Sequence, residues 1–177
     1  MAKATGPLYV VHFKRRREGK TNYAKRLGLL KSGIHRLVVR KNNRYLLVQV
    51  VSWKEQGDET ASSVSSKALG QFGFQGKCNT PSAYLAGLLC GARAKAKGVS
   101  EIILDAGLQT PSKGSVIFAA LKGAVDAGLK SYFSEEILPS ADRLQGKHLQ
   151  KQSGDFEAAK QKILSNPAGE KPAGKKK

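Results

Sequence analysis

The chain begins with a segment that shows no regular spacing of apolar residues, and a helical pattern follows it. Residues 1–20 have no sustained period and contain a run of four cations, so we expect an extended arm without fixed structure. After Thr21, which can act as an N-cap, Tyr23, Leu27 and Leu30 recur at spacings of three or four residues. This pattern predicts a helix with one apolar and one basic face that ends at the following Ser-Gly pair.

Two segments rich in β-branched residues come next and predict a hairpin. Arg36–Lys41 and Tyr45–Trp53 are separated by a short connection with two asparagines, which tolerate the positive φ of tight turns. A turn at Gly57-Asp58 precedes residues 59–66, whose weak alternation indicates a third strand. Residues 71–77 are rich in glycine, and we expect a loop there.

In the second half of the chain, helical and strand patterns alternate. Thr80-Pro81 predicts the start of a helix, with Thr80 as the N-cap and the proline in the first turn, and Gly98 marks its end. The other expected elements are a strand at 101–105, a helix at 115–127, a strand at 129–133, a short helix within 140–150 and a C-terminal helix at 155–164. A helix–strand–helix–strand order predicts a parallel strand pair in an α/β sheet.

The length of 177 residues suits one domain with tails. We expect three parts: a basic arm and helix at 1–33, an α/β core at 34–149, and a C-terminal helix with a cationic tail at 150–177. No apolar run approaches the roughly 20 residues needed to span a bilayer, and we expect no secretion signal because the N-terminus lacks an apolar core.

Positive charge is concentrated near the N-terminus. The chain has a net charge of +18, and residues 13–44 alone hold twelve Lys or Arg residues against one acid, Glu18. Such a block repels itself unless a polyanion neutralises it, which points to nucleic acid. The candidate RNA-binding residues are Lys14, Arg15, Arg16, Arg17, Lys20, Thr21, Asn22, Tyr23, Lys25, Arg26, Lys31, His35, Arg36, Arg40, Lys41 and Arg44.

Double-helical RNA fits this arrangement of charge. Arginine grips phosphate with two parallel hydrogen bonds, and proteins recognise RNA duplexes mainly by their backbone and shape. A flexible arm, a basic helix and a hairpin suit that task. A weaker alternative is a basic protein that coats DNA or an anionic membrane.

Signs of catalysis are few. Gly19-Lys20-Thr21 resembles the end of a nucleotide-binding loop, but position 14 is a lysine where that loop needs a glycine. The runner-up function is a metal-dependent nuclease built around Asp105. Such an enzyme needs three or four convergent carboxylates, and the sequence pattern does not bring that many acids to one site. A simpler role for Asp105 is to cap a turn or to pair with a lysine.

The histidines and cysteines do not form a site. His12, His35 and His148 show no local catalytic spacing, and we expect surface histidines. Cys78 and Cys90 are too few for a metal cage, so two buried, reduced thiols are expected. We expect no metal, no cofactor and no catalytic residue.

Several long motifs resemble those of a known family. They are RRREGKTNYAKRLGLLKSG at 15–33, RLVVRKNN at 36–43, GDET at 57–60, NTPSAYLAGLLCGARAKAKG at 79–98, ILDAGLQTPSKGSVIFAALKGAVDAGL at 103–129 and SEEILPSADRLQGKHL at 134–149. Together they resemble the archaeal and eukaryotic branch of the uL18 family, the large-subunit ribosomal proteins that bind 5S ribosomal RNA.

This resemblance implies a three-layer α/β fold like that of ribonuclease H, without its catalytic carboxylates, and a non-enzymatic role in the cytoplasmic ribosome. The implied partners are 5S rRNA, large-subunit rRNA and neighbouring 5S-binding proteins of the central protuberance, with no membrane and no small-molecule substrate. The RNA contacts would lie in 14–31 and on the hairpin 36–44. Arg143, Gly146 and His148 also match the family pattern, without an assigned contact.

Overall fold

A four-stranded mixed sheet forms the centre of the protein. The computed structural model describes residues 6–149 and 155–166. The strands are β1 (His35–Lys41), β2 (Leu46–Ser52), β3 (Glu59–Ser65) and β4 (Ile102–Asp105), and they lie in the order β3-β2-β1-β4. The predicted hairpin is confirmed, because β1 and β2 pair antiparallel, and so is the third strand, which pairs antiparallel with β2. β4 joins the other side of β1 in parallel.

The strand predicted at 129–133 is wrong. Only one residue of this segment, Lys130, forms a bridge, which is parallel to Glu101. The preceding Leu129 is buried in the core, whereas Tyr132 is 88% exposed, so the chain leaves the sheet directly after the bridge. Lys130 exchanges backbone hydrogen bonds with Ser100 and Ile102 at the beginning of β4, and the segment does not follow β4 any further.

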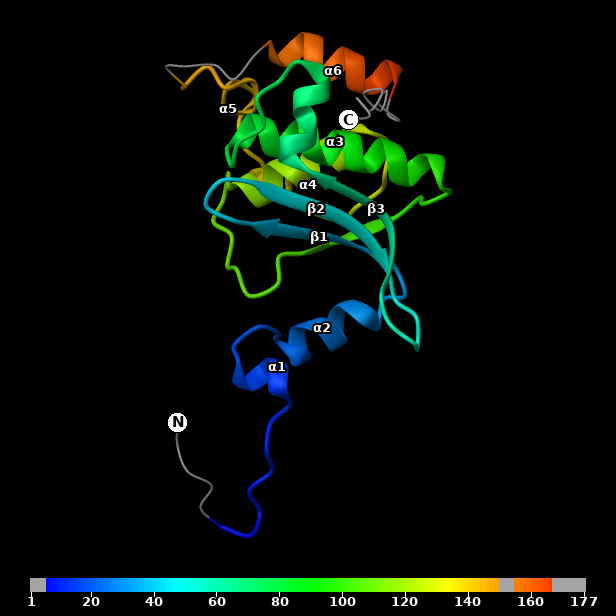
Figure 1. Cartoon of the computed structure of the whole chain (residues 1–177), viewed down its shortest axis with the longest axis vertical. Coiled ribbons are helices and arrows are strands. Elements are labelled where there is room, and N and C mark those ends of the chain that lie inside the picture. The colour runs from blue at the N-terminus through cyan, green and yellow to red at the C-terminus, as the bar shows by residue number, and fades with distance from the viewer. Residues whose placement is uncertain (1–5, 150–154, 167–177) are drawn as a thin grey trace, which may run out of the picture.

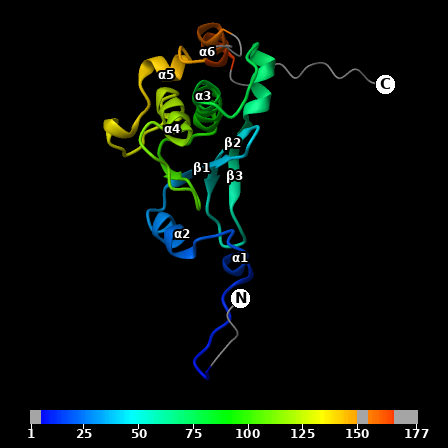
Figure 2. The ribbon, with the colours of Figure 1, turned by 90° about the vertical axis from the view of Figure 1, so that its left-hand side faces the viewer.

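Helices cover the sheet on both sides (Figures 1 and 2). They are α1 (Lys14–Arg17), α2 (Tyr23–Leu30), α3 (Thr80–Ala96), α4 (Val116–Asp126), α5 (Ala141–Gln145) and α6 (Phe156–Ser165), with 3-10 turns at Ser66–Phe72 and Glu135–Ile137. α3 and α4 lie on one face of the sheet, with α6 outside α3, and α2 lies on the opposite face. The result is the predicted three-layer α/β architecture.

Close contact between α3 and α4 depends on two glycines. A Cβ at Gly87 would lie 2.1 Å from the carbonyl oxygen of Ala120, and a Cβ at Gly123 would lie 2.1 Å from that of Tyr84. Each helix therefore presents bare backbone to the other. The buried side chains of α3, α4 and the inner face of the sheet form the hydrophobic core.

Asparagines cap two of the helices, where the sequence had favoured threonines. The Asn79 side chain accepts a hydrogen bond from the backbone N–H of Ser82 and caps α3, so Thr80 is already the first helical residue. Asn22 caps α2 in the same way, through the N–H of Lys25. In both helices the amide oxygen of an asparagine next to the predicted threonine reaches a free N–H group of the first turn.

The expectation of an extended arm is wrong for Lys14–Arg17, which form the short helix α1. The backbone N–H of Arg17 donates to the carbonyl of Phe13, and Gly19 turns the chain with a φ of +63°. Residues 6–13 contain no helix or strand. The arm points away from the core in Figure 1.

The remaining predicted elements are confirmed with small shifts. The predicted loop at 71–77 begins two residues late, because Gln71 and Phe72 complete a 3-10 turn. The C-terminal helix is α6, capped by Asp155, while the predicted cationic tail from 167 onward lies outside the described residues. The proposed division at residues 33 and 149 stays a prediction. Among the described residues, no helix is both long and apolar enough to cross a bilayer.

At the open edge of the sheet, no further strand from the described residues lies beside β3. The side chain of Lys97, at the end of α3, reaches over this edge and donates a hydrogen bond to the carbonyl oxygen of Ala61. One backbone carbonyl oxygen of the edge strand β3 therefore already accepts a hydrogen bond from within the chain.

Candidate nucleic-acid interface

The two N-terminal helices form one small unit outside the core. The rings of Phe13 and Tyr23 pack with their centroids 5.2 Å apart, and the Arg15 Nε donates to the Thr21 hydroxyl at 2.9 Å. These contacts hold α1 against the beginning of α2. Thr21 thus has a structural role within the predicted RNA-binding set.

Most cations of this unit face solvent. All four residues of α1 are exposed, as are Lys25 and Lys31. Lys20 forms a 2.8 Å ion pair with Glu18, in which both side chains are largely accessible. Among the described residues, Lys14, Arg16 and Arg17 have no ion pair with an acid of the chain. Their charge is therefore available to an external anion.

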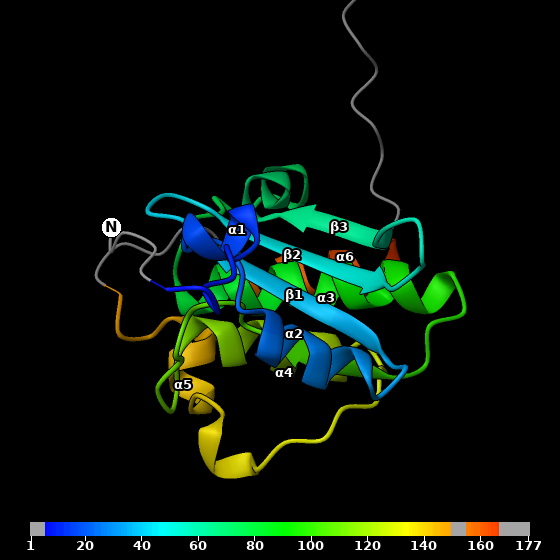
Figure 3. The same cartoon turned by 90° about the horizontal axis from the view of Figure 1, so that it is seen from below.

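The hairpin turn adds to the same basic surface. α2 and β1 run in opposite directions. α1, which precedes α2, therefore lies near the end of β1 that leads into the hairpin turn (Figure 3). Lys41 and Arg44 are exposed there. His35, at the other end of β1, is half-buried. The structure therefore brings the arm, both short helices and the hairpin to one side of the domain.

A cavity of about 540 Å³ separates the N-terminal helices from the loop after β4. Among the described residues, its basic lining consists of Arg15, Lys20, Lys25, Arg26 and Arg40, and Asp105 is its single acid. A cleft with this excess of guanidinium and ammonium groups suits a phosphate of a nucleic-acid backbone.

A second cavity, of about 710 Å³, lies between the hairpin turn and the beginning of α4. Lys41, Lys113 and Arg143 line it, and no acid does within the part of the chain that the structure describes. Lys113 and Arg143 were not among the predicted RNA-binding residues, because they come from a loop and from α5, far along the chain. Gly146 ends α5 with a φ of +81°, and His148 is exposed.

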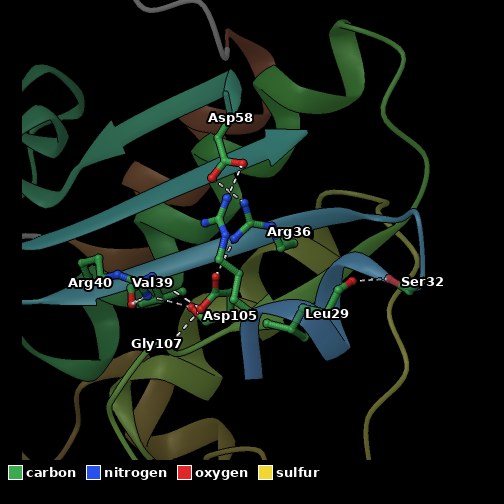
Figure 4. A network of polar contacts seen from close by, with 9 residues as sticks. Leu29, Ser32, Arg36, Val39, Arg40, Asp58, Asp105 and Gly107 are labelled. Atoms are coloured by element: carbon green, nitrogen blue, oxygen red, sulfur yellow. Dashed lines mark hydrogen bonds and ion pairs between the residues drawn. The ribbon is translucent and has the colours of Figure 1, made fainter. Parts of the chain in front are cut away.

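Arg36 is not available to RNA, contrary to the prediction. Only 2% of it is exposed, and its guanidinium bridges two carboxylates (Figure 4). Nη1 donates to Asp105 at 2.8 Å and Nη2 donates to Asp58 at 2.6 Å. Arg36 is therefore a core residue and does not belong to the basic surface.

Two further arginines extend this network. Arg26 of α2 donates to the second oxygen of Asp58 at 2.8 Å. Arg40 lies 3.4 Å from an Asp105 oxygen and keeps 43% of its side chain exposed. Burial raises the pKa of Asp58, but the hydrogen bonds and charges of Arg36 and Arg26 outweigh it and hold that pKa below its ordinary value. Asp58 is therefore ionised at neutral pH.

The surroundings of Asp105 do not favour the nuclease alternative. Its oxygens accept hydrogen bonds from Arg36, Arg40 and the backbone N–H of Gly107, so it caps a turn as expected but pairs with arginines and not with a lysine. In the part of the chain that the structure describes, no three His, Cys, Asp or Glu residues gather as a metal site would require.

The other candidates for chemistry are dispersed. His12 and His148 are exposed. Cys78 and Cys90 are free thiols, but only Cys90 is fully buried; Cys78 is half-buried, which corrects the expectation for that residue. Burial raises the pKa of both thiols, so both are protonated and weakly nucleophilic at neutral pH.

Comparison with known proteins identifies the family. The sequence model of the family described as "Ribosomal large subunit proteins 60S L5, and 50S L18" matches residues 8–101 and 94–134. The chain belongs to this ribosomal-protein family. A relative from the archaeon Methanoregula boonei, "Large ribosomal subunit protein uL18", is 50% identical over 147 residues, which cover 82% of this chain and 84% of the relative. The resemblance to the archaeal branch of the uL18 family is thereby confirmed.

The matched residues include most of the basic surface. The family match begins at residue 8, so it covers α1, α2 and the hairpin, and it extends through β4 and α4. The exposed arginines of α1 and the buried Arg36 network therefore lie in the part of the chain that is common to the uL18 family.

Proposed function

We propose that this chain, as a uL18-family constituent of the large subunit of the cytoplasmic ribosome, binds 5S rRNA and helps to attach it to the large rRNA in the central protuberance. The observation that carries the proposal is the one-sided basic surface. Exposed cations of α1, α2 and the hairpin turn gather on it, and those of α1 have no neutralising acid among the described residues. A folded RNA supplies the matching polyanion.

Each part of the surface has its own task. The exposed arginines Arg16 and Arg17 contact phosphates, while Lys41 and Arg44 reach a second stretch of backbone from the hairpin. The cavity beside α2 receives a phosphate between Lys20 and Arg40. Contacts of this kind position the RNA by its shape and not by its base sequence.

The second cavity offers a surface for another partner. Lys41, Lys113 and Arg143 line it, so this face offers cations to a second RNA, which we assign as large-subunit rRNA, with Lys41 lying between the two contacts. Neighbouring 5S-binding proteins would dock on the remaining faces of the α/β core. The chain acts in this assembly as a binding protein and carries out no catalysis.

The salt dependence of binding tests this proposal. The affinity of the full chain for 5S rRNA is measured at increasing salt, for the wild type and for a variant with Arg15, Arg16 and Arg17 changed to Gln. The slope of log affinity against log salt is negative, and each lost phosphate contact reduces its magnitude by about 0.9, the value for a B-form duplex. A reduction of up to about 2.7 is therefore expected for the triple variant, together with weaker binding.

A control variant carries Gln at Lys67, Lys130 and Lys147, three exposed lysines of the core. It has the same net charge as the arginine variant and should keep most of the wild-type slope. Equal slopes for the two variants, or a salt-independent affinity, would overturn the proposal. Duplex DNA as competitor separates RNA binding from general polyanion binding, because DNA of equal length should compete poorly.

The nuclease alternative has its own measurement. 5S rRNA incubated with the chain and Mg²⁺ should stay intact at high protein concentration. Cleavage that is lost in Asp105→Asn would instead establish catalysis.

A further inference from the structure

We propose that Asp58, an acidic residue, promotes RNA binding because it holds the basic helix α2 in its binding position. Asp58 is a positioning residue in this account and does not itself contact RNA. The inference rests on the proposed function, since it assumes that α2 belongs to the RNA-binding surface.

Packing alone fixes α2 weakly. The helix has eight residues and none of them is buried. Leu27, which the sequence pattern placed on an inward apolar face, is 56% exposed. A cavity of about 540 Å³ separates the helix from residues 104–111. A helix this short is marginal by itself in water and needs a tertiary contact to stay in place.

Asp58 supplies such a contact from the turn between β2 and β3. One carboxylate oxygen accepts from Arg26 of α2 at 2.8 Å, and the other accepts from Arg36 of β1 at 2.6 Å. Arg36 in turn donates to Asp105 of β4 at 2.8 Å. The helix is therefore connected through one carboxylate to two strands of the sheet (Figure 4).

The two sides of this connection differ in rigidity. The Arg36 side chain is 2% exposed and cannot reorient without disturbing the core, whereas those of Arg26 and Asp58 are 34% and 28% exposed. Asp58 is thus fixed on the core side and accessible on the helix side. This arrangement orients α2 before RNA arrives, which reduces the ordering that binding would otherwise require.

Charge alone predicts the opposite effect of Asp58. The chain carries +18, and an acid beside its basic surface repels phosphate, so its removal should strengthen binding. If Asp58 orients α2, its removal should weaken binding. The sign of the change distinguishes the two accounts.

The decisive experiment compares Asp58→Asn with Glu55→Gln in the full chain. Both variants lose one negative charge from the same turn, but Glu55 is exposed and has no ion pair among the described residues. We expect Asp58→Asn to bind 5S rRNA about three- to ten-fold more weakly at every salt concentration, and Glu55→Gln to bind as tightly as wild type or slightly more tightly. Equal or tighter binding by Asp58→Asn would overturn the proposal.

A second pair of variants tests the helix side of the contact. Because Arg26 is engaged by Asp58, Arg26→Gln should weaken binding without changing the salt slope, whereas Lys25→Gln should reduce the slope by about 0.9, as expected for a lost phosphate contact. The double variant Arg26→Gln/Asp58→Asn should bind no more weakly than the weaker single variant. Additive losses, or a reduced slope for Arg26→Gln, would show that Arg26 contacts RNA directly and would refute the positioning role.

Hydrogen exchange of the free protein gives a readout independent of RNA. Backbone amides of α2 should exchange several-fold faster in both Asp58→Asn and Arg26→Gln, while those of β1 stay protected in Arg26→Gln. Unchanged exchange in α2 would contradict the proposal. If Asp58→Asn fails to fold, Arg26→Gln breaks the same contact, leaves Arg36 paired and decides the question alone.

The outcomes separate this inference from the proposed function. If the arginine triple variant keeps wild-type binding to 5S rRNA, the proposed function fails. If that variant loses binding but Asp58→Asn does not, only the positioning role fails.

Discussion

Arg36 of β1 and Asp105 of β4 form a buried ion pair, with 2.8 Å between Nη1 and Oδ2. Only 2% of the arginine side chain and 9% of the aspartate side chain are exposed, and the two residues are 69 positions apart in the sequence. The pair joins the parallel strands β1 and β4. It gives a structural role to both residues, although the sequence had indicated RNA binding for Arg36 and possible catalysis for Asp105.

Loss of this pair should destabilise the fold. Asp105→Asn leaves the Arg36 charge buried with Asp58 as its one remaining carboxylate, and we expect the free energy of unfolding to fall by roughly 3 kcal/mol. Urea denaturation measures the change. Asp142→Asn, which breaks an exposed pair with Lys147, is the control and should change stability by less than about 0.5 kcal/mol. Similar losses of unfolding free energy in both variants would show that the buried pair contributes no more to stability than the exposed pair.

The pH dependence of stability should reveal the low pKa of Asp58. Arg36 and Arg26 hold the folded-state pKa of this carboxyl below its ordinary value of 3.8. Its contribution is therefore fully present above about pH 4, where the unfolded chain is also ionised, and is lost as the pH falls through the folded-state pKa. The difference in unfolding free energy between wild type and Asp58→Asn should be constant from pH 7 to about 5 and shrink below about pH 4. A pH-independent difference would contradict this linkage.

Two glycine-to-alanine substitutions should have opposite effects. At Gly87 a new Cβ would meet the Ala120 carbonyl oxygen at 2.1 Å, so Gly87→Ala must separate α3 from α4 and should cost about 3 kcal/mol. At Gly28 of α2 a Cβ meets no atom within 4 Å, and Gly28→Ala should raise helix stability by up to about 1 kcal/mol. Thermal unfolding reports the first change, and amide exchange of α2 reports the second. A neutral Gly87→Ala would mean that the helices are farther apart than the structure shows.

Local patterns were sufficient to predict most of the fold. β1 and β2 are rich in β-branched residues with a two-asparagine turn between them, and α3 begins with a threonine and a proline. The error at 129–133 has a physical reason. An apolar segment that follows a helix matches a strand locally, but whether it joins the sheet depends on the path of the folded chain, which here leaves the sheet after a single bridge at Lys130.

The general position of the candidate interface was also visible in the sequence, because twelve cations gather within residues 13–44. The roles of the individual cations could not be predicted from the sequence. Arg36 and Arg16 carry the same charge in the same basic block, but Arg36 meets partners 22 and 69 residues away, and only the folded chain brings these together. Lys113 and Arg143 were missed for the converse reason: they join the hairpin turn around a cavity through tertiary structure alone.

The hydrogen bond from Lys97 to the Ala61 carbonyl oxygen has a consequence for the protein in its unbound state. The unpaired N–H and C=O groups of an edge strand can form hydrogen bonds with a strand of another chain. A charged side chain at that edge is one of the features by which proteins prevent such aggregation. In the unbound protein, Lys97, which follows α3 directly, thus hinders self-association at β3.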